Sequence, residues 1–182
     1  MYDRTTRFIR MAALTSGLLP VPAATAAQGG RPNIVVIVAD DLLSSEISCY
    51  GGRNLETTHI DRLAREGLRM TNVYASMSMS VPIRASLYTG LYPARHGSWL
   101  NHKDTFLGTK TVCEYMAEEG YRVARAGKNH PVNPDVYRFE ELPGFPVNCV
   151  SRKAPYDTSG IREFITRDDS RPFLLFVCSI HP

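Results

Sequence analysis

Asn33-Ile-Val-Val-Ile-Val-Ala39 is the stretch of sequence that decides the fold. It is a continuous apolar run rich in β-branched residues, a pattern typical of a central parallel strand that is covered on both faces. Asp40 and Asp41 follow it directly. Because ligands in open α/β sheets bind just beyond the carboxyl ends of the strands, the sequence predicts that this acidic pair lies at a functional site.

Strands and helices alternate along the rest of the chain. The residue pattern predicts further strands over residues 68–74, 121–126 and 172–179, and helices over residues 57–67, 109–119 and 157–169. Residues 131–156 carry five prolines and are predicted to be irregular. The alternation predicts an α/β fold around a mostly parallel sheet.

The composition is that of an ordinary globular protein. The 182 residues are 43% hydrophobic and 21% charged, with a formal net charge of +3. The sequence has no basic run and no alternation of basic and aromatic residues, which argues against a nucleic-acid partner. Its four cysteines lack CxxC spacing, so no zinc or redox motif is predicted, and the apolar surroundings of Cys178 favour a buried thiol.

Residues 1–27 are predicted to be a secretory signal peptide. Three arginines precede a mildly apolar run over residues 11–21, and Ala24-Thr25-Ala26 fits a small-x-small cleavage site. The apolar run is too short and too interrupted by glycine and proline to span a membrane. The signal predicts an exported protein, periplasmic or secreted; a disordered N-terminus is the alternative.

Ser80-Val-Pro-Ile-Arg-Ala-Ser-Leu-Tyr-Thr-Gly90 carries the strongest chemical signal. Proline suits the first turn of a helix, so Pro82 places Ser80 at or just before a helix start, where free N–H groups and the helix dipole favour anions. Arg84 lies one turn further on and can direct its donors back to the same place. A hydroxyl over an anion site beside a guanidinium suits attack on a phosphate or sulfate ester. The alternative is an N-cap serine followed by a solvated arginine.

Two other groups are expected near Ser80. The adjacent carboxylates of Asp40 and Asp41 repel each other unless a cation or hydrogen bonds neutralise them, and a hard cation such as Ca²⁺ or Mg²⁺ accepts such oxygens. A helix cap with a solvated acid is the alternative. Lys128 and His130 follow the predicted strand 121–126, at the edge of the sheet where Asp40 is also expected.

Four motifs occur in order and together resemble a known family. They are Arg31-Pro-Asn-Ile-Val-Val-Ile-Val-Ala-Asp-Asp41, Ile60-Asp-Arg-Leu-Ala64, Ser80-x-Pro82-x-Arg84 with Thr89-Gly90, and Gly127-Lys-x-His130. The chain resembles the N-terminal part of formylglycine-dependent sulfatases, in the alkaline phosphatase superfamily, over nearly all of residues 31–182. The branch that contains sulfamidase (heparan N-sulfatase) is the most similar. The resemblance implies an alkaline-phosphatase-like α/β sandwich with a mostly parallel central sheet, incomplete at the C-terminus.

The resemblance also implies a role for each site residue. Asp40, Asp41 and Ser80 would bind Ca²⁺, with Mg²⁺ as the alternative. A maturation enzyme would oxidise Ser80 to formylglycine, the nucleophile. Arg84 would stabilise the aldehyde hydrate, Lys128 would hold the sulfate, and His130 would help to release it. The implied substrate is a sulfated carbohydrate, an O-sulfate ester or a sulfamate.

Two departures from the family pattern keep other functions open. Ile83 stands where the modification motif usually has a small residue, and the family's later histidine acid and Asp–Asn ligands have no match in residues 31–182. The chain is therefore expected to be a fragment of a sulfatase catalytic domain, inactive alone. One alternative is a phosphoester or phosphonate hydrolase that uses unmodified Ser80. The other is a non-catalytic pseudoenzyme remnant.

Overall fold

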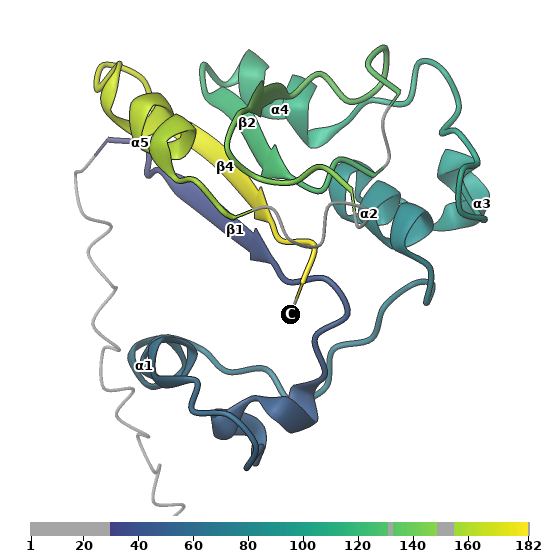
Figure 1. Ribbon diagram of the computed structural model, residues 1–182. Coiled ribbons are helices and arrows are strands. Elements are labelled where there is room, and N and C mark those ends of the chain that lie inside the picture. Colours follow the sequence, from purple (N-terminus) through teal and green to yellow (C-terminus); the bar gives the residue numbers. More distant parts are fainter. Residues whose placement is uncertain (1–29, 131–132, 149–154, 182) are drawn as a thin grey trace, which may run out of the picture. The chain divides into compact units, whose positions relative to one another are not determined.

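Four parallel strands form a single sheet in the part of the chain that a computed structural model describes, residues 30–130, 133–148 and 155–181 (Figure 1). The strands are β1 (Ile34–Val38), β2 (Arg122–Gly127), β3 (Glu140–Leu142) and β4 (Phe173–Cys178). Their order in the sheet is β1-β4-β2-β3. Since all pairs are parallel, every strand ends at the same edge of the sheet.

The helices connect these strands. They are α1 (Thr58–Glu66), α2 (Ser80–Thr89), α3 (Pro93–His96), α4 (Val112–Glu118) and α5 (Ser159–Thr166), with short 3-10 helices at Ser44–Glu46 and Ser48–Tyr50. In α4, Thr111 and Glu114 form a capping box, which fixes the start of that helix. Within the described ranges, no helix combines the length and the apolar character that crossing a bilayer requires.

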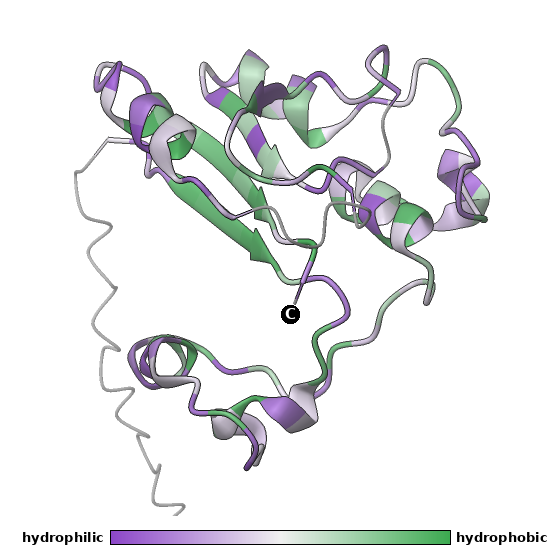
Figure 2. Ribbon diagram, in the orientation of Figure 1, coloured by the Kyte–Doolittle hydropathy of each residue, from purple (hydrophilic) through white to green (hydrophobic). Residues whose placement is uncertain are grey.

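The core lies on both faces of the sheet because side chains of β4 alternate between them. Leu174, Phe176 and Cys178 pack on one face with Tyr88 of α2. Phe173 and Leu175 face the other side, where they pack with Phe164 of α5 and the small side chains of β2. Figure 2 shows the apolar colouring that runs along β1 and β4. The predicted α/β fold with a mostly parallel sheet is confirmed, and Cys178 is a buried thiol as expected.

The prediction that β1 is a central, doubly covered strand is wrong for the described residues. β1 lies at the edge of the sheet, and Val35 and Ile37 are 50% and 70% exposed. These two residues pair with Leu175 and Val177 of β4 and so share the face on which α5 packs. The packing of α5 covers β2 and β4 but leaves this face of β1 open. A continuous apolar run therefore indicates that both faces of a strand are apolar. It does not show that other elements of the chain cover both faces.

Two other secondary-structure predictions need correction. Residues 68–74 form no strand, and Leu68 and Tyr74 are largely exposed because this segment pairs with no edge of the sheet. Residues 131–156 were expected to be irregular, but Glu140–Leu142 forms β3 beside β2.

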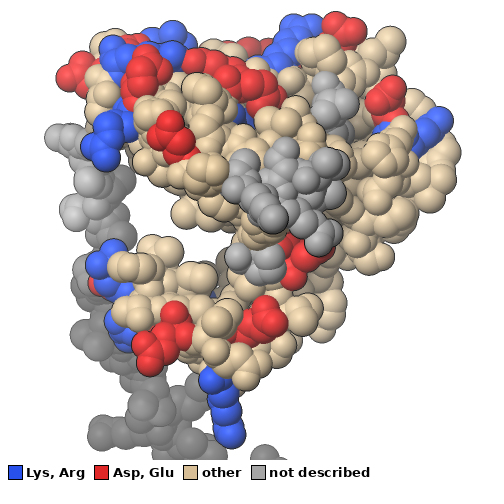
Figure 3. All heavy atoms as spheres, viewed as in Figure 1, with Lys and Arg blue, Asp and Glu red and all other residues tan. Residues whose placement is uncertain are grey.

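Figure 3 shows basic and acidic side chains intermixed over the face in view. The predicted signal peptide lies outside the described residues.

Candidate functional site

Asp40, Arg84 and Lys128 meet at the edge where the parallel strands end. Asp40 follows β1 and Lys128 follows β2, so the sheet delivers both side chains to this edge. Asp40 Oδ1 accepts a hydrogen bond from Arg84 Nη2 at 3.1 Å, and Asp40 Oδ2 accepts one from the ammonium group of Lys128. One carboxylate thus joins two cations that lie 44 residues apart in the sequence.

Ser80 is the first residue of α2, as predicted from Pro82. Arg84 Nε donates a weak hydrogen bond to Ser80 Oγ at 3.4 Å, from one helical turn further on. The other end of the helix is closed by Gly90, whose left-handed backbone (φ 69°) suits glycine. The start of α2 therefore holds a hydroxyl and a guanidinium in one place.

One nitrogen of the Arg84 guanidinium makes no hydrogen bond to the described residues. Arg84 is only 3% exposed, and its Nη1 has no hydrogen-bond partner among the described residues. Buried donors in native proteins nearly always have a partner. An anionic oxygen at this position would satisfy Nη1, which fits the predicted role of Arg84 beside a bound anion.

The charges of this cluster shift the pKa values of its members. Burial alone would raise the pKa of Asp40, but hydrogen bonds from Lys128 and Arg84 outweigh it and hold that pKa below its ordinary value. Burial lowers the pKa of His130, and the charge of Lys128 lowers it further. Asp40 is therefore ionised and His130 neutral near pH 7.

A cavity of about 250 Å³ opens beside Ser80. We call it the Ser80 cavity; its lining residues are Val38, Ala39, Asp40, Asp41, Ser78, Ser80, Ile83, Arg84 and Leu87. Four of the predicted site residues therefore line one cavity. Lys128 and His130 do not line it; Lys128 reaches it through Asp40.

The donors in the Ser80 cavity fit a hard cation in kind. Asp41 is exposed, and its left-handed backbone (φ 55°) is a conformation that aspartate adopts more readily than most residues. The carboxylates of Asp40 and Asp41 and the hydroxyl of Ser80 are oxygen ligands of the type that Ca²⁺ and Mg²⁺ prefer. Among the described residues, no group of three or more His, Cys, Asp or Glu side chains could hold a metal ion. These donors would thus supply part of a coordination shell.

Two site residues escaped prediction from the sequence. Met79, the N-cap of α2, provides no side-chain cap; instead Asn101 Oδ1 accepts the N–H of Val81 at 3.1 Å. The next residue, His102, lies edge-on to His130, with ring centroids 5.8 Å apart. The sequence shows that the loop after Trp99 is polar, but only the folded path of the chain brings it to α2 and His130.

Comparisons with known proteins give a consistent result. The Sulfatase family model matches residues 32–182. The ulvan-active sulfatase of Formosa agariphila is 33% identical over 154 residues, which are 84% of this chain and 30% of that protein.

Solved structures show the same fold. An enzyme in complex with its substrate D-glucosamine-2-N,6-O-disulfate is 26% identical, with a TM-score of 0.71 over 84% of this chain and 35% of that one. The phosphonate monoester hydrolase of Agrobacterium radiobacter has a TM-score of 0.62 at 20% identity, over 82% of this chain and 41% of that one, and shows the fold alone. The predicted alkaline-phosphatase-like fold is confirmed, whereas the sulfamidase branch stays a prediction. This chain spans between 30% and 41% of the lengths of these three proteins.

Proposed function

Because the chain belongs to the sulfatase family, we propose that it carries the nucleophile side of a site that hydrolyses sulfate esters or sulfamates of sulfated carbohydrates. The observation that carries this proposal is the hydrogen-bonded group of Ser80, Arg84, Asp40 and Lys128 at the carboxyl edge of the sheet. The ulvan-active relative and the structural neighbour with a sulfated glucosamine substrate support the carbohydrate class. Residues 31–182 are proposed as the N-terminal part of the catalytic domain, behind an export signal at residues 1–27.

The proposed roles separate the nucleophile position from the cations that bind the anionic group. Ser80 is the proposed nucleophile position, and its oxidation to formylglycine by a separate maturation enzyme would supply an aldehyde hydrate with one oxygen to attack sulfur and a second to expel sulfate. The free Nη1 of Arg84 is proposed to bind an oxygen of the transferring group. Lys128 is proposed to hold the sulfate from the other side of Asp40. Both cations offset charge where it develops during the reaction.

His130 is proposed to accept a proton in the step that releases sulfate. Its lowered pKa leaves the imidazole neutral near pH 7, so one ring nitrogen can accept a proton when sulfate leaves. The His102 ring lies edge-on to His130, with the ring centroids 5.8 Å apart. In this role His130 is a general base for the release step.

A divalent cation is proposed at Asp40, Asp41 and Ser80, where it would act as a Lewis acid on a sulfate oxygen. Thermal unfolding tests its site without any activity. Adding Ca²⁺, or Mg²⁺, is expected to raise the melting temperature of the 182-residue chain by mass action. Asp41→Asn, at an exposed position, should abolish that rise. An equal rise in both proteins would contradict this cation site.

Intact mass spectrometry tests the nucleophile. In a host that contains the maturation enzyme, a fraction of the chain should lose the mass of two hydrogen atoms, and peptide mapping should place the loss at Ser80. Ser80→Ala is the control and should show no loss. We expect the 182-residue chain alone to give no measurable turnover of an aryl sulfate, because its described residues supply only part of the cation ligands. Turnover that disappears in Ser80→Ala would contradict this expectation of inactivity.

A second candidate function is a phosphonate or phosphoester hydrolase that uses unmodified Ser80. Ile83 lines the Ser80 cavity where the modification motif usually has a small residue, and the phosphonate monoester hydrolase neighbour has the same fold. The same mass measurement separates the two. A Ser80 that stays unmodified beside an active maturation enzyme favours the hydroxyl nucleophile over formylglycine.

A further inference from the structure

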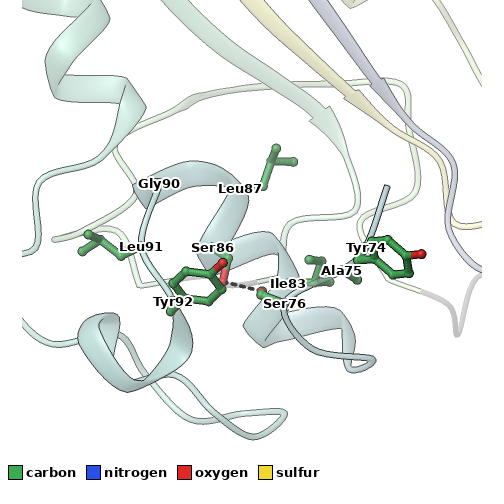
Figure 4. Close-up of a pocket in the computed structure, with 9 residues that line it drawn as sticks. All are labelled: Tyr74, Ala75, Ser76, Ile83, Ser86, Leu87, Gly90, Leu91 and Tyr92. Atoms are coloured by element: carbon green, nitrogen blue, oxygen red, sulfur yellow. Dashed lines mark hydrogen bonds between the residues drawn. The ribbon is translucent and has the colours of Figure 1, made fainter. Parts of the chain in front are cut away.

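A second cavity lies against the outer side of α2. It measures about 460 Å³, within the size range of small-ligand sites. We call it the tyrosine cavity; its lining residues are Tyr74, Ala75, Ser76, Ile83, Ser86, Leu87, Gly90, Leu91 and Tyr92 (Figure 4). In the close-up, Tyr92 and Tyr74 lie on opposite sides of the Ser76–Ser86 hydrogen bond.

Two exposed tyrosines form the sides of this cavity. Tyr74 is 88% exposed and Tyr92 is 75% exposed. Neither phenolic hydroxyl is committed to a hydrogen bond within the described residues. Each ring thus offers an apolar face and a polar tip to a ligand.

The hydroxyl groups of Ser76 and Ser86 form the floor of the tyrosine cavity. Their hydrogen bonds show that Ser86 is not activated as a nucleophile. Ser86 Oγ lies 3.1 Å from His96 Nε2 and 2.9 Å from Ser76 Oγ. His96 Nδ1 accepts the N–H of Ser98, and burial lowers the pKa of His96, so the neutral ring carries its proton on Nε2. Nε2 therefore donates to Ser86 and cannot act as its base. Ser86 accepts these bonds and keeps its own proton for a ligand.

The tyrosine cavity and the Ser80 cavity are neighbours on one helix. Ile83 and Leu87 line both. Ser80 and Ser86 are six residues apart on α2, which corresponds to about 9 Å along the helix axis. A ligand that places an anionic group at Ser80 can therefore reach the tyrosine cavity only if it is longer than a single ring.

We propose that the tyrosine cavity is a saccharide-binding subsite, which holds a neighbouring ring of the same sulfated saccharide whose sulfate lies at Ser80. A pyranose ring has apolar C–H faces and a rim of hydroxyls, which match the tyrosine faces and the serine floor. This inference rests on the proposed function, because the sulfated end of the ligand is assigned by that function. It makes Tyr74 and Tyr92 determinants of saccharide length.

Calorimetric titration of the 182-residue chain tests the subsite. The probes are inorganic sulfate, a sulfated monosaccharide, a sulfated tetrasaccharide and the same tetrasaccharide after desulfation. The sulfated tetrasaccharide should bind more tightly than the monosaccharide. Tyr92→Ala and Tyr74→Ala should each weaken tetrasaccharide binding about fivefold and leave inorganic sulfate binding unchanged. Tyr92→Phe should retain the affinity, because it retains the ring.

Tyr115→Ala is the matched control, since Tyr115 is also an exposed tyrosine but lies on α4. Equal binding of the tetrasaccharide to wild type, Tyr74→Ala and Tyr92→Ala would overturn the subsite. A chain that dimerises, and loses its dimer in Tyr92→Ala, would also overturn it in favour of a second copy in the cavity.

Failure of the proposed function gives a different result. If the Ser80 cavity binds no sulfate, the sulfated and desulfated tetrasaccharides bind equally and Lys128→Ala changes neither, while the tyrosine variants still weaken both. If only the subsite is wrong, Lys128→Ala weakens the sulfated probes and the tyrosine variants do not.

Discussion

Asp40 provides the negative charge that balances the buried positive charges of the site. Its carboxylate is the shared acceptor for Arg84 and Lys128, and both of these cations are more than nine-tenths buried. Asp40→Asn would leave two buried positive charges without their counter-charge. We expect it to lower the free energy of unfolding by about 3 kcal/mol, as is typical when one partner of a buried ion pair is removed. Urea unfolding of the metal-free chain measures this loss.

Asp41→Asn is the control for this prediction. Asp41 is exposed and makes no ion pair among the described residues, so its substitution should change the free energy of unfolding by less than about 0.5 kcal/mol. Equal losses in the two variants would show that Asp40 does not stabilise the cluster through its two cations.

Lys128 is expected to contribute to the lowered pKa of His130. Burial is the largest cause of the lowered pKa of His130, and the positive charge of Lys128 is the next. Lys128→Gln should therefore raise this pKa toward its ordinary value, which a proton NMR titration of the His130 ring measures. Lys110→Gln removes an exposed lysine that pairs with Glu118 and should leave the pKa of His130 unchanged.

The same shift gives a pH dependence of stability with a definite sign. The pKa of His130 is lower in the folded chain, so between the two pKa values the unfolded chain binds the proton more readily. The contribution of His130 is fully present above its unfolded pKa, about 6.5, and is lost as the pH falls through the folded pKa. His130→Gln should flatten the unfolding free energy over that window. An unchanged slope in His130→Gln would contradict this assignment.

At this scale, the sequence could predict those residues that the strand ends and the helix start position directly. Asp40 follows the apolar run that forms β1, Lys128 follows the predicted strand that forms β2, and Pro82 marks the helix start that holds Ser80. Asn101 and His102 could not be predicted, because a loop residue reaches its partner through the tertiary path of the chain. No local spacing links Asn101 to Val81, 20 residues earlier.

The start of α2 depends on a cap that comes from another segment. Asn101 supplies the acceptor that an N-cap side chain normally provides. Asn101→Ala should lower the free energy of unfolding by about 1 kcal/mol, measured by urea unfolding. Asn101→Asp keeps the acceptor oxygen and adds a negative charge near the positive end of the helix dipole, so it should restore the stability. Equal losses in both variants would contradict the capping role.

The open face of β1 predicts self-association. Val35 and Ile37 present apolar surface beside Val177 without a covering helix. Ile37→Lys should leave the thermal stability nearly unchanged and raise the soluble, monomeric fraction in analytical ultracentrifugation. Leu175→Ala is the contrasting variant. Leu175 is almost fully buried in β4, so its truncation should cost about 3 kcal/mol.

The type of each element was easier to predict from the sequence than which elements lie beside it in the fold. The strands β1, β2 and β4 and the helix at Ser80 follow from residue patterns that depend only on local geometry. The position of β1 at an edge follows from its pairing with β4 alone among the described strands, which no local pattern reveals. The failure over residues 68–74 has the same origin, because an apolar segment becomes a strand only where the tertiary path of the chain brings it beside a partner strand.

The whole molecule places its chemistry on one edge of a parallel sheet. Parallel topology brings the ends of β1, β2 and β4 together, so residues from widely separated motifs share one site. This is why motifs in sequence order could predict a site whose members are distant in sequence. The tyrosine cavity could not be predicted in this way, since Tyr74 and Tyr92 flank α2 from two connecting segments that carry no strand-end signal.

The pairing of β1 with β4 sets the timing of folding during synthesis. Phe173 N–H donates to the side chain of Asn33, its partner 140 residues earlier. At about 5–20 residues per second, β1 leaves the ribosome on the order of 10 s before β4 exists. During that interval its apolar strand lacks its partner, because β4 is the strand that pairs with β1 in the described sheet. The nascent chain therefore passes through a long aggregation-prone stage, in which a chaperone that holds the segment Asn33–Ala39 would act before Asp40 and Lys128 can meet.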